Sequence, residues 1–477
     1  LLVWPFTLHL LETVGHSSTM DIAGDDYSAV RVGSQLRKVL TKQLTTNSRP
    51  EAPEARAMTT VLGSAFFDKE ALNTAGHNII LAILDFKNPV SVREVKTTLK
   101  GRLCEIPRFR SNPVNLAKEG EKVKLKLGFE EKTDEEMDTI TDSLIKERCD
   151  IKSKAELNAT LSKMAQEEWE QELPLWRIFV ANSMDDGMSR LLVMIHHALA
   201  DGTACVQVLM SILDDVGEQP QQVSSRSLKK PSVGCLAQVQ GLLRACFSPF
   251  AGPCLPGDPP NKLKQGKFKP ETPKACTVTD ALALERVKAV KNKLGGTIND
   301  VLMTVTALTL QKYFKKYDDK ALKQKVRCQF PMNMRTAKGA DILKTEEFGN
   351  RFVFGSLTFP VHLTDPLKIY ANMKHQIDIV KASPEPLVMM KLQSLLKTMD
   401  MKDVAQIAVD GASKFTVMLS NVPGPLEKVQ LLGQYIEDMA FHTFSPFSMY
   451  FGVIQYAGSF RVGINTDATC EPEPSKL

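Results

Sequence analysis

Apolar residues in this chain occur in two patterns that alternate along its length: short continuous runs and stripes with helical spacing. A run of five or more apolar residues that includes β-branched side chains predicts a buried strand, and apolar residues three or four apart predict one face of a helix. The first part of the chain therefore predicts strands at residues 78–86, 176–181 and 191–195, a helix marked by Val95, Leu99 and Leu103 after the first strand, and a helix from Ala204 to Val216 after the last.

The second half of the chain continues in the same way, and its clearest element is a long helix that begins near residue 297. Thr297 and Asp300 fit a capping box at its start, and Ile298, Val301 and Val305 lie on its apolar face. Capping is a sufficient explanation of Asp300, but it leaves the neighbouring Asn299 unexplained. The other elements predicted here are a strand and turn at 277–287, a strand after Gly349-Asn350, a strand ending in the rigid turn SNVPGP at 415–425, and a hairpin at 451–467.

Shifts in composition divide the chain into four parts. We assign residues 1–57 to an apolar N-terminus followed by a mobile polar connector, 58–216 to an N-terminal half, 217–275 to a linker, and 276–477 to a C-terminal half. Within the N-terminal half, residues 119–168 are charged and partly helical, with Leu157, Leu161 and Met164 as the regular apolar points. We interpret that stretch as a solvated connecting segment.

Two apolar segments outside these elements could contact a membrane. Residues 1–11 are too short to span a bilayer as they stand, and the end of a signal anchor and a docking segment explain them equally well. Residues 233–250 form an apolar helical stripe, which suits a surface of anionic lipid because lysines follow it. A crossover helix packed between domains, with a solvated loop behind it, explains the same stripe equally well. The lysines in question are Lys262, Lys264, Lys267, Lys269 and Lys274.

Composition excludes several classes of protein. Hydrophobic residues make up 43% of the 477 and charged residues 24%, which is typical of a globular chain. The net charge of +5 is too small to argue for nucleic acid as a partner. The nine cysteines are odd in number and contain no CxxC pair, so they predict reduced thiols of a cytosol-facing protein and neither a disulfide framework nor a metal site.

The stretch that carries chemistry is HHALADG, residues 196–202, in the connection between the strand at 191–195 and the following helix. Catalytic groups concentrate in such connections, and histidine can accept and return a proton near neutral pH. A pair of half-buried, hydrogen-bonded imidazoles at a strand end is the structural alternative. The arrangement therefore suggests proton transfer by a histidine but does not by itself establish it.

The motif HHxxxDG resembles the signature of the CoA-dependent acyltransferase superfamily, which includes chloramphenicol acetyltransferase and condensation domains. Other fragments extend the likeness, from about residue 60 to the end, to the bifunctional wax ester synthase/diacylglycerol acyltransferases. The chain departs from that family at TTVLGSAFFD, which stands where members commonly carry a Pro-Leu-Ser-Pro segment. It also has no DFGWG, which argues against the plant acyltransferases that share HxxxD. The matching fragments are PRFRSN, the Pro-Leu-Trp ending at Trp176, Asn299-Asp300, PMNMRT and SNVPGP.

The resemblance implies an α/β fold of two chloramphenicol-acetyltransferase-like halves with mixed sheets and an active-site channel between them. It implies His197 as general base, His196 as a residue that shapes the loop, and Asp201 as a charge that holds the motif by an ion pair. Gly202 would allow close helix packing or an unusual backbone dihedral, and Asn299 is the candidate oxyanion donor.

The activity implied is transfer of a long-chain acyl group from acyl-CoA, as co-substrate, to a fatty alcohol, to diacylglycerol or to both, with no permanently bound cofactor and no metal. Such sparingly soluble substrates favour a place on the cytosolic face of the endoplasmic reticulum membrane or on a lipid droplet. A non-catalytic lipid-binding or interaction protein on the same fold is the alternative.

Overall fold

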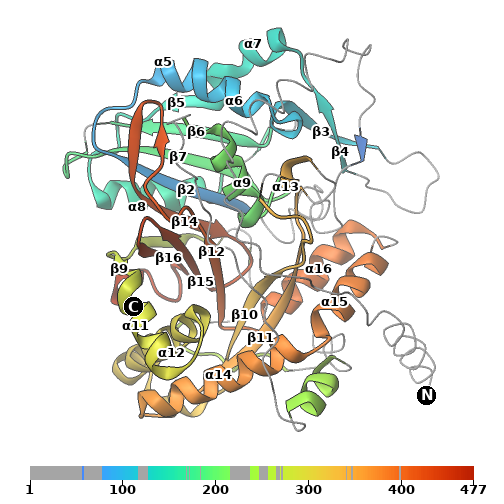
Figure 1. Ribbon diagram of the computed structural model, residues 1–477, viewed down its shortest axis with the longest axis vertical. Coiled ribbons are helices and arrows are strands. Elements are labelled where there is room, and N and C mark those ends of the chain that lie inside the picture. The colour runs from blue at the N-terminus through green and yellow to red at the C-terminus, as the bar shows by residue number, and fades with distance from the viewer. Residues whose placement is uncertain are drawn as a thin grey trace.

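Most strands of the computed structural model lie in two mixed sheets, one in each half of the molecule, with helices packed on them (Figure 1). The predicted division into two α/β halves is therefore present. The structure describes residues 56–57, 78–116, 127–167, 169–170, 172–182, 184–214, 237–245, 256–264, 269, 272–339, 341–344, 348–396 and 399–477.

The sheet of the N-terminal half has the strand order β13-β14-β2-β7-β6-β5, in which β5 and β6 are parallel and the other pairs antiparallel. The predicted strands are β2 (Ile79–Phe86), β6 (Trp176–Ala181) and β7 (Ser189–His196). The helices beside them are α5 (Val92–Glu94), η1 (Val95–Leu99), α6 (Lys100–Cys104), η2 (Pro107–Arg110) and α9 (Gly202–Ile212). A small separate sheet contains β1 (Arg56–Ala57), β3 (Ser111–Asn115) and β4 (Leu127–Glu131).

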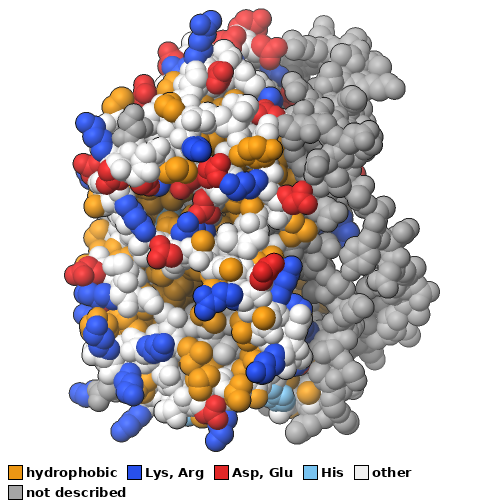
Figure 2. Space-filling view, turned by 60° about the vertical axis from the view of Figure 1, so that its left-hand side comes forward, with side chains coloured by type: hydrophobic (Ala, Val, Ile, Leu, Met, Phe, Trp, Pro, Cys, Tyr) orange, Lys and Arg blue, Asp and Glu red, His pale blue; other side chains and the backbone are white. Residues whose placement is uncertain are grey.

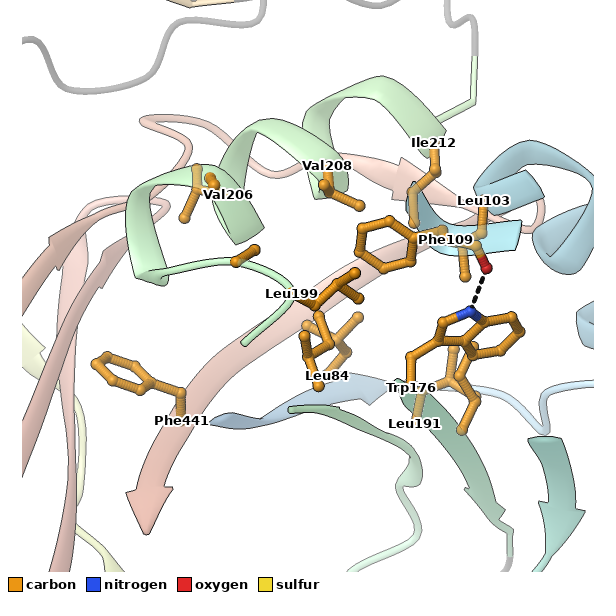
Figure 3. Packing of buried hydrophobic residues seen from close by; sticks show 14 of the residues in the cluster. Leu84, Leu103, Phe109, Trp176, Leu191, Leu199, Val206, Val208, Ile212 and Phe441 are labelled. Carbon is orange, nitrogen blue, oxygen red and sulfur yellow. Dashed lines mark hydrogen bonds between the residues drawn. The ribbon is translucent and has the colours of Figure 1, made fainter. Parts of the chain in front are cut away.

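The core of this half lies between its sheet and α6 and α9. Leu99 and Leu103 are buried there, as their helical spacing predicts. The largest buried side chain is that of Trp176, whose indole N–H donates a 2.7 Å hydrogen bond to the carbonyl oxygen of Phe109 (Figure 3). A buried indole needs such a partner, and this bond ties the start of β6 to the end of η2.

The C-terminal sheet has the order β11-β10-β12-β15-β16-β8, with β9 paired to β16. Its strands are β8 (Lys274–Val278), β9 (Leu282–Ala283), β10 (Val326–Asn333), β11 (Phe352–Phe359), β12 (Val417–Pro423), β15 (Met449–Tyr456) and β16 (Ser459–Asp467). The helices of this half are α11 (Leu284–Leu294), α12 (Ile298–Tyr317), η3 (Asp319–Lys323), α13 (Asp341–Lys344), α14 (Pro366–Ala382), α15 (Glu385–Leu395), α16 (Met401–Ala412) and η5 (Pro474–Lys476).

Several predicted features of this half are present. Thr297 and Asp300 form the predicted capping box, with each side chain bonded to the backbone N–H of the other residue. The predicted final hairpin is β15 with β16.

One strand of the predicted C-terminal half, residues 276–477, lies in the sheet of the N-terminal half. β14 (Gln434–Phe444), preceded by the short β13 (Gln430–Leu431), pairs with β2 in the sheet of the other half. The predicted C-terminal half is therefore not structurally self-contained. Sequence reading could not place β14, because its partner lies more than three hundred residues earlier.

The interpretation of residues 119–168 as a solvated segment is wrong for the part that the structure describes. This part forms α7 (Asp134–Leu144), β5 (Ile145–Glu147) and α8 (Lys154–Met164). Leu157, Leu161 and Met164 are buried against the N-terminal sheet. The sparse apolar positions are sufficient because α8 covers the sheet with one narrow face, while charged residues occupy the other.

Two of the five lysines in the predicted cluster are buried and do not face a surface. Lys264 is buried and donates to the backbone carbonyl of Asp258, and Lys274 is buried in an ion pair with Asp467. Lys267 lies outside the described residues. The face shown in Figure 2 carries both basic and acidic side chains.

The predicted apolar N-terminus and most of the connector after it lie outside the described residues; Arg56–Ala57, at the end of the connector, pair with β4. Of the stripe at 233–250, the structure describes a helix at residues 237–245. In the described part of the chain, we find no helix of sufficient length and hydropathy to cross a bilayer.

Candidate active site

A cavity of about 670 Å³ runs between the two halves, and HHALADG lies on its wall. Its lining is mostly apolar and falls into two groups of residues. The first group, which we call the N-terminal arm, lies under α9 and is partly visible in Figure 3. The second, the C-terminal arm, lies between β10 and β11 and the helices α15 and α16. The N-terminal arm includes Leu84, Leu103, Phe109, Trp176, Val208 and Ile212; the C-terminal arm includes Phe352, Phe354, Met389, Leu392, Val404 and Phe415.

His197 lies on the wall of this cavity. Its backbone N–H donates to the carbonyl of Asn78, at the start of β2, and its ring lies 5.9 Å from that of Phe352 between ring centres. Burial in this apolar setting lowers the pKa of His197 below 6.5, although Asp201, the backbone of His197 and Asn350 oppose the shift. The imidazole is therefore neutral at pH 7, as a general base must be.

Asn350 forms two hydrogen bonds with His197, one to its backbone and one to its ring. The Nδ2 of Asn350 donates to the carbonyl oxygen of His197 at 2.7 Å, which orients the carboxamide. Its Oδ1 then lies 2.8 Å from Nδ1 of His197 and must accept the ring proton there. This fixes the tautomer, so Nε2 is the ring nitrogen that can accept a proton from a substrate.

His196 is buried beside His197, and its predicted role in shaping the loop stays a prediction. It is fully buried, and its Nδ1 accepts a hydrogen bond from the backbone N–H of Ala198 at 3.2 Å. Its ring also packs edge-on against Trp169 at 5.5 Å. His196 is not among the residues that line the cavity, which fits this predicted role.

Asp201 holds the motif together rather than facing His197. Its Oδ1 caps α9 by accepting from the N–H of Ala204, and its Oδ2 accepts from the N–H of Arg351. Oδ2 also forms a 2.8 Å ion pair with Arg335, whose side chain is only 1% exposed. The predicted ion pair is thus present, and it joins α9 to the C-terminal half.

Gly202 allows α9 to approach β12 closely. A Cβ atom at this position would lie 2.9 Å from Cγ2 of Val422, so any larger residue would push the helix away from the strand. The close packing expected of this glycine is therefore present.

Asn299 does not lie among the described residues that line the cavity, whereas Asn421 does. Asn421 Nδ2 donates to Asn299 Oδ1 at 2.7 Å, which places Asn299 one step behind the wall. The role of Asn299 as oxyanion donor stays a prediction. The geometry favours an indirect form of it, in which Asn299 positions the carboxamide of Asn421.

Sequence reading missed the roles of three parts of this site. Asn350 and Arg335 stood in the matching fragments GNRFVFG and PMNMRT, but nothing local shows that they contact His197 and Asp201. The helices α15 and α16 were not predicted, although they form much of the C-terminal arm.

In the residues that the structure describes, no three His, Cys, Asp or Glu side chains gather in a way that could hold a metal ion.

Comparison with known proteins agrees with this geometry. Residues 62–249 match the wax ester synthase/diacylglycerol acyltransferase catalytic domain, and residues 348–477 match the C-terminal domain of the same family. The chain is 25% identical to wax ester synthase/diacylglycerol acyltransferase 11 of Arabidopsis thaliana over 361 residues, which cover 66% of this chain and 73% of that protein. It is 22% identical to wax ester synthase/diacylglycerol acyltransferase 5 of the same plant over 450 residues, which cover 83% of this chain and 87% of that protein.

Solved structures show the same fold. The wax ester synthase/diacylglycerol acyltransferase of Marinobacter aquaeolei VT8 superposes with a TM-score of 0.53 at 16% identity, covering 87% of this chain and 95% of that one. The trichothecene 15-O-acetyltransferase of Fusarium sporotrichioides gives 0.55 at 12% identity, with 88% and 93% covered. The predicted α/β fold of this superfamily is confirmed, and the chain belongs to the wax ester synthase/diacylglycerol acyltransferase family of acyltransferases.

Proposed function

We propose that the protein transfers a long-chain acyl group from acyl-CoA to the hydroxyl of a fatty alcohol, of diacylglycerol, or of both. The observation that carries this proposal is the position of His197, a neutral and oriented imidazole on the wall of a mostly apolar cavity lined by both halves. Two lipid chains, one from each substrate, could enter from opposite sides and meet at that ring. Family membership supports the same reaction class.

The chemistry needs one base and one anion-stabilising group. Nε2 of His197 removes the proton from the acceptor hydroxyl while its oxygen attacks the thioester carbonyl carbon. The carbonyl oxygen becomes an oxyanion, for which Asn421 is the nearest candidate donor on the cavity wall. Collapse of this intermediate breaks the C–S bond, and the CoA sulfur takes the proton from His197 and leaves as the thiol, which restores the neutral imidazole. Atoms and charge balance without an acyl-enzyme or a cofactor.

We also propose that the protein works at the cytosolic face of the endoplasmic reticulum membrane or on a lipid droplet. The apolar lining of the cavity supports this location, because substrates that suit it partition into lipid rather than water.

The test is release of CoA by the purified chain, with hexadecanol and diolein offered separately and in competition. His197→Ala should lower kcat by about 10²- to 10⁴-fold with both acceptors and leave the melting temperature unchanged. His375→Ala, which changes an exposed histidine on α14, is the matched control and should keep full activity.

Residual activity of His197→Ala above about a tenth of wild type would refute its role as general base. If the wild-type chain released no CoA with either acceptor but bound fatty acid or diacylglycerol, the non-catalytic alternative would be correct. The competition assay would also decide between wax ester and triacylglycerol as the main product.

A further inference from the structure

Two helices of the C-terminal half expose their large apolar side chains to solvent. They are α15 and the helix at residues 237–245, drawn in yellow-green at the foot of Figure 1. A surface helix normally buries such residues and exposes its charged ones. We call these five side chains the exposed apolar face; they are Val239, Leu242, Leu243, Leu387 and Met390, each between 38% and 51% exposed.

The usual amphipathic order is reversed in the helix at 237–245, because its small residues face inward. Gly241 and Ala245 are buried. A Cβ atom at Gly241 would lie 3.3 Å from Cα of Ser383, and the Ser383 hydroxyl donates to the carbonyl of Gly241 at 2.7 Å. This helix is therefore held against the end of α14 by its small side, which leaves its leucines directed away from the protein.

Polar groups between the two helices are already satisfied by one another. Arg244 forms an ion pair with Glu385 and a hydrogen bond to the backbone carbonyl of Ser356. Glu385 is the only acidic residue in α15 and the helix at 237–245, and this pair neutralises it. The other charged residue of α15, Lys391, is exposed. The large side chains that the two helices direct outward are therefore mainly apolar.

The exposed apolar face continues into the substrate cavity. Met389 and Leu392 of α15, and Leu396 just after it, line the C-terminal arm, while Leu387 and Met390 of α15 are exposed. Ile407 of α16 lines the cavity and is also 45% exposed, so the cavity reaches the surface beside this helix. A lipid substrate could pass from the exposed apolar face into the C-terminal arm without crossing a polar surface.

We propose that the exposed apolar face inserts into a lipid monolayer and that the lipid acceptor enters the C-terminal arm beside α15. The proposal rests on the proposed function for its choice of a lipid surface over a protein as partner. An exposed apolar patch of this kind marks an interaction site, and its opening into an apolar cavity fits lipid. The attachment is apolar rather than electrostatic, since Lys264 and Lys274 are buried within the protein.

The test is flotation of the full chain with phosphatidylcholine vesicles at low and high salt. The wild-type protein should bind, with affinity that changes by less than about twofold between the two salts. The double variants Leu242→Ser/Leu243→Ser and Leu387→Ser/Met390→Ser should each weaken binding by at least about tenfold. None of these four residues lines the cavity, so each variant should keep its activity on octanoyl-CoA with a short, water-soluble alcohol. Activity on diolein dissolved in vesicles should fall with vesicle binding.

The matched control is Val290→Ser/Val305→Ser, which truncates exposed valines of α11 and α12, away from α15 in Figure 1. It should bind vesicles as the wild type does. The proposal is overturned if wild-type protein does not float with vesicles, or if the leucine variants float unchanged. It is also overturned if sedimentation velocity shows that those variants dissociate a wild-type dimer, because the face would then contact a second copy. Vesicle binding without CoA release on any acceptor would uphold the surface and refute the proposed function.

Discussion

Replacing Asn350 with alanine removes the 2.8 Å hydrogen bond to Nδ1 of His197 and the 2.7 Å hydrogen bond to the backbone carbonyl of the same residue. A hydrogen bond of this kind contributes about 1 kcal/mol, so the ring and the backbone that carries it together lose about 2 kcal/mol of positioning energy. Since 1.36 kcal/mol corresponds to a factor of ten in rate, kcat should fall about thirtyfold. KM should change little, because Asn350 is not among the residues that line the cavity.

The assay is steady-state CoA release, combined with a pH profile that a purely structural role would not alter. In the wild type, the lowered pKa of His197 places the acid limb of kcat/KM below pH 6.5, with a plateau above it. Asn350→Asp puts a carboxylate beside Nδ1, which should raise this pKa by about 1 to 3 units and move the limb to higher pH. The reasoning is refuted if Asn350→Ala keeps kcat within about twofold of wild type, or if the aspartate variant has an unshifted limb.

Three further changes test other parts of the structure. Asp201→Asn leaves the buried Arg335 without its ion pair, so unfolding free energy in urea should fall by about 3 to 5 kcal/mol and activity with it; lost turnover at unchanged stability would instead indicate a catalytic role for Asp201. Burial lowers the pKa of His442 from 6.5 to about 4. Between these two pH values the imidazole takes up a proton in the unfolded chain but not in the folded one, so the free energy of unfolding should fall by roughly 3 kcal/mol as the pH drops through this range. His442→Gln should flatten this slope, and an equally steep acid limb in that variant would contradict the assignment. Ile212→Phe narrows the N-terminal arm, so kcat/KM should fall at least about tenfold for the long-chain form of one substrate only. The comparisons are palmitoyl-CoA with octanoyl-CoA, and hexadecanol with octanol. Equal losses for long-chain acyl-CoA and long-chain alcohol would contradict separate arms.

Local signals predicted the part of the site that is local in the chain. The strand before HHALADG, the helix after it and the ion-pairing role of Asp201 follow from residues within one strand–loop–helix unit. The capping box at Thr297 is equally local, because its two residues are three apart. In each case the side chain and its backbone partner are neighbours, so propensity and spacing are sufficient.

Tertiary contacts account for what could not be predicted. Asn350 reaches His197 across 153 residues of sequence, and no spacing rule connects them. The apolar residues of α15 gave no usable signal for a different reason. They line a cavity on one side and face solvent on the other, so the helix lacks the single apolar face by which an amphipathic helix is recognised.

The glycines of the last hairpin explain how a strand of one half can enter the sheet of the other. β14 passes over β15 and β16 at Phe441, where Cβ atoms at Gly452 and Gly463 would lie 2.8 and 2.1 Å from the Phe441 carbonyl oxygen. Only glycine allows the backbones to approach this closely. Beyond this crossing, Phe444 pairs with Ile79 in β2, next to Asn78, whose carbonyl accepts the backbone N–H of His197. The backbone of the proposed base is thus held by a strand pair that both halves supply, and its ring is held by Asn350 from the C-terminal half. Both halves are therefore needed to position one imidazole.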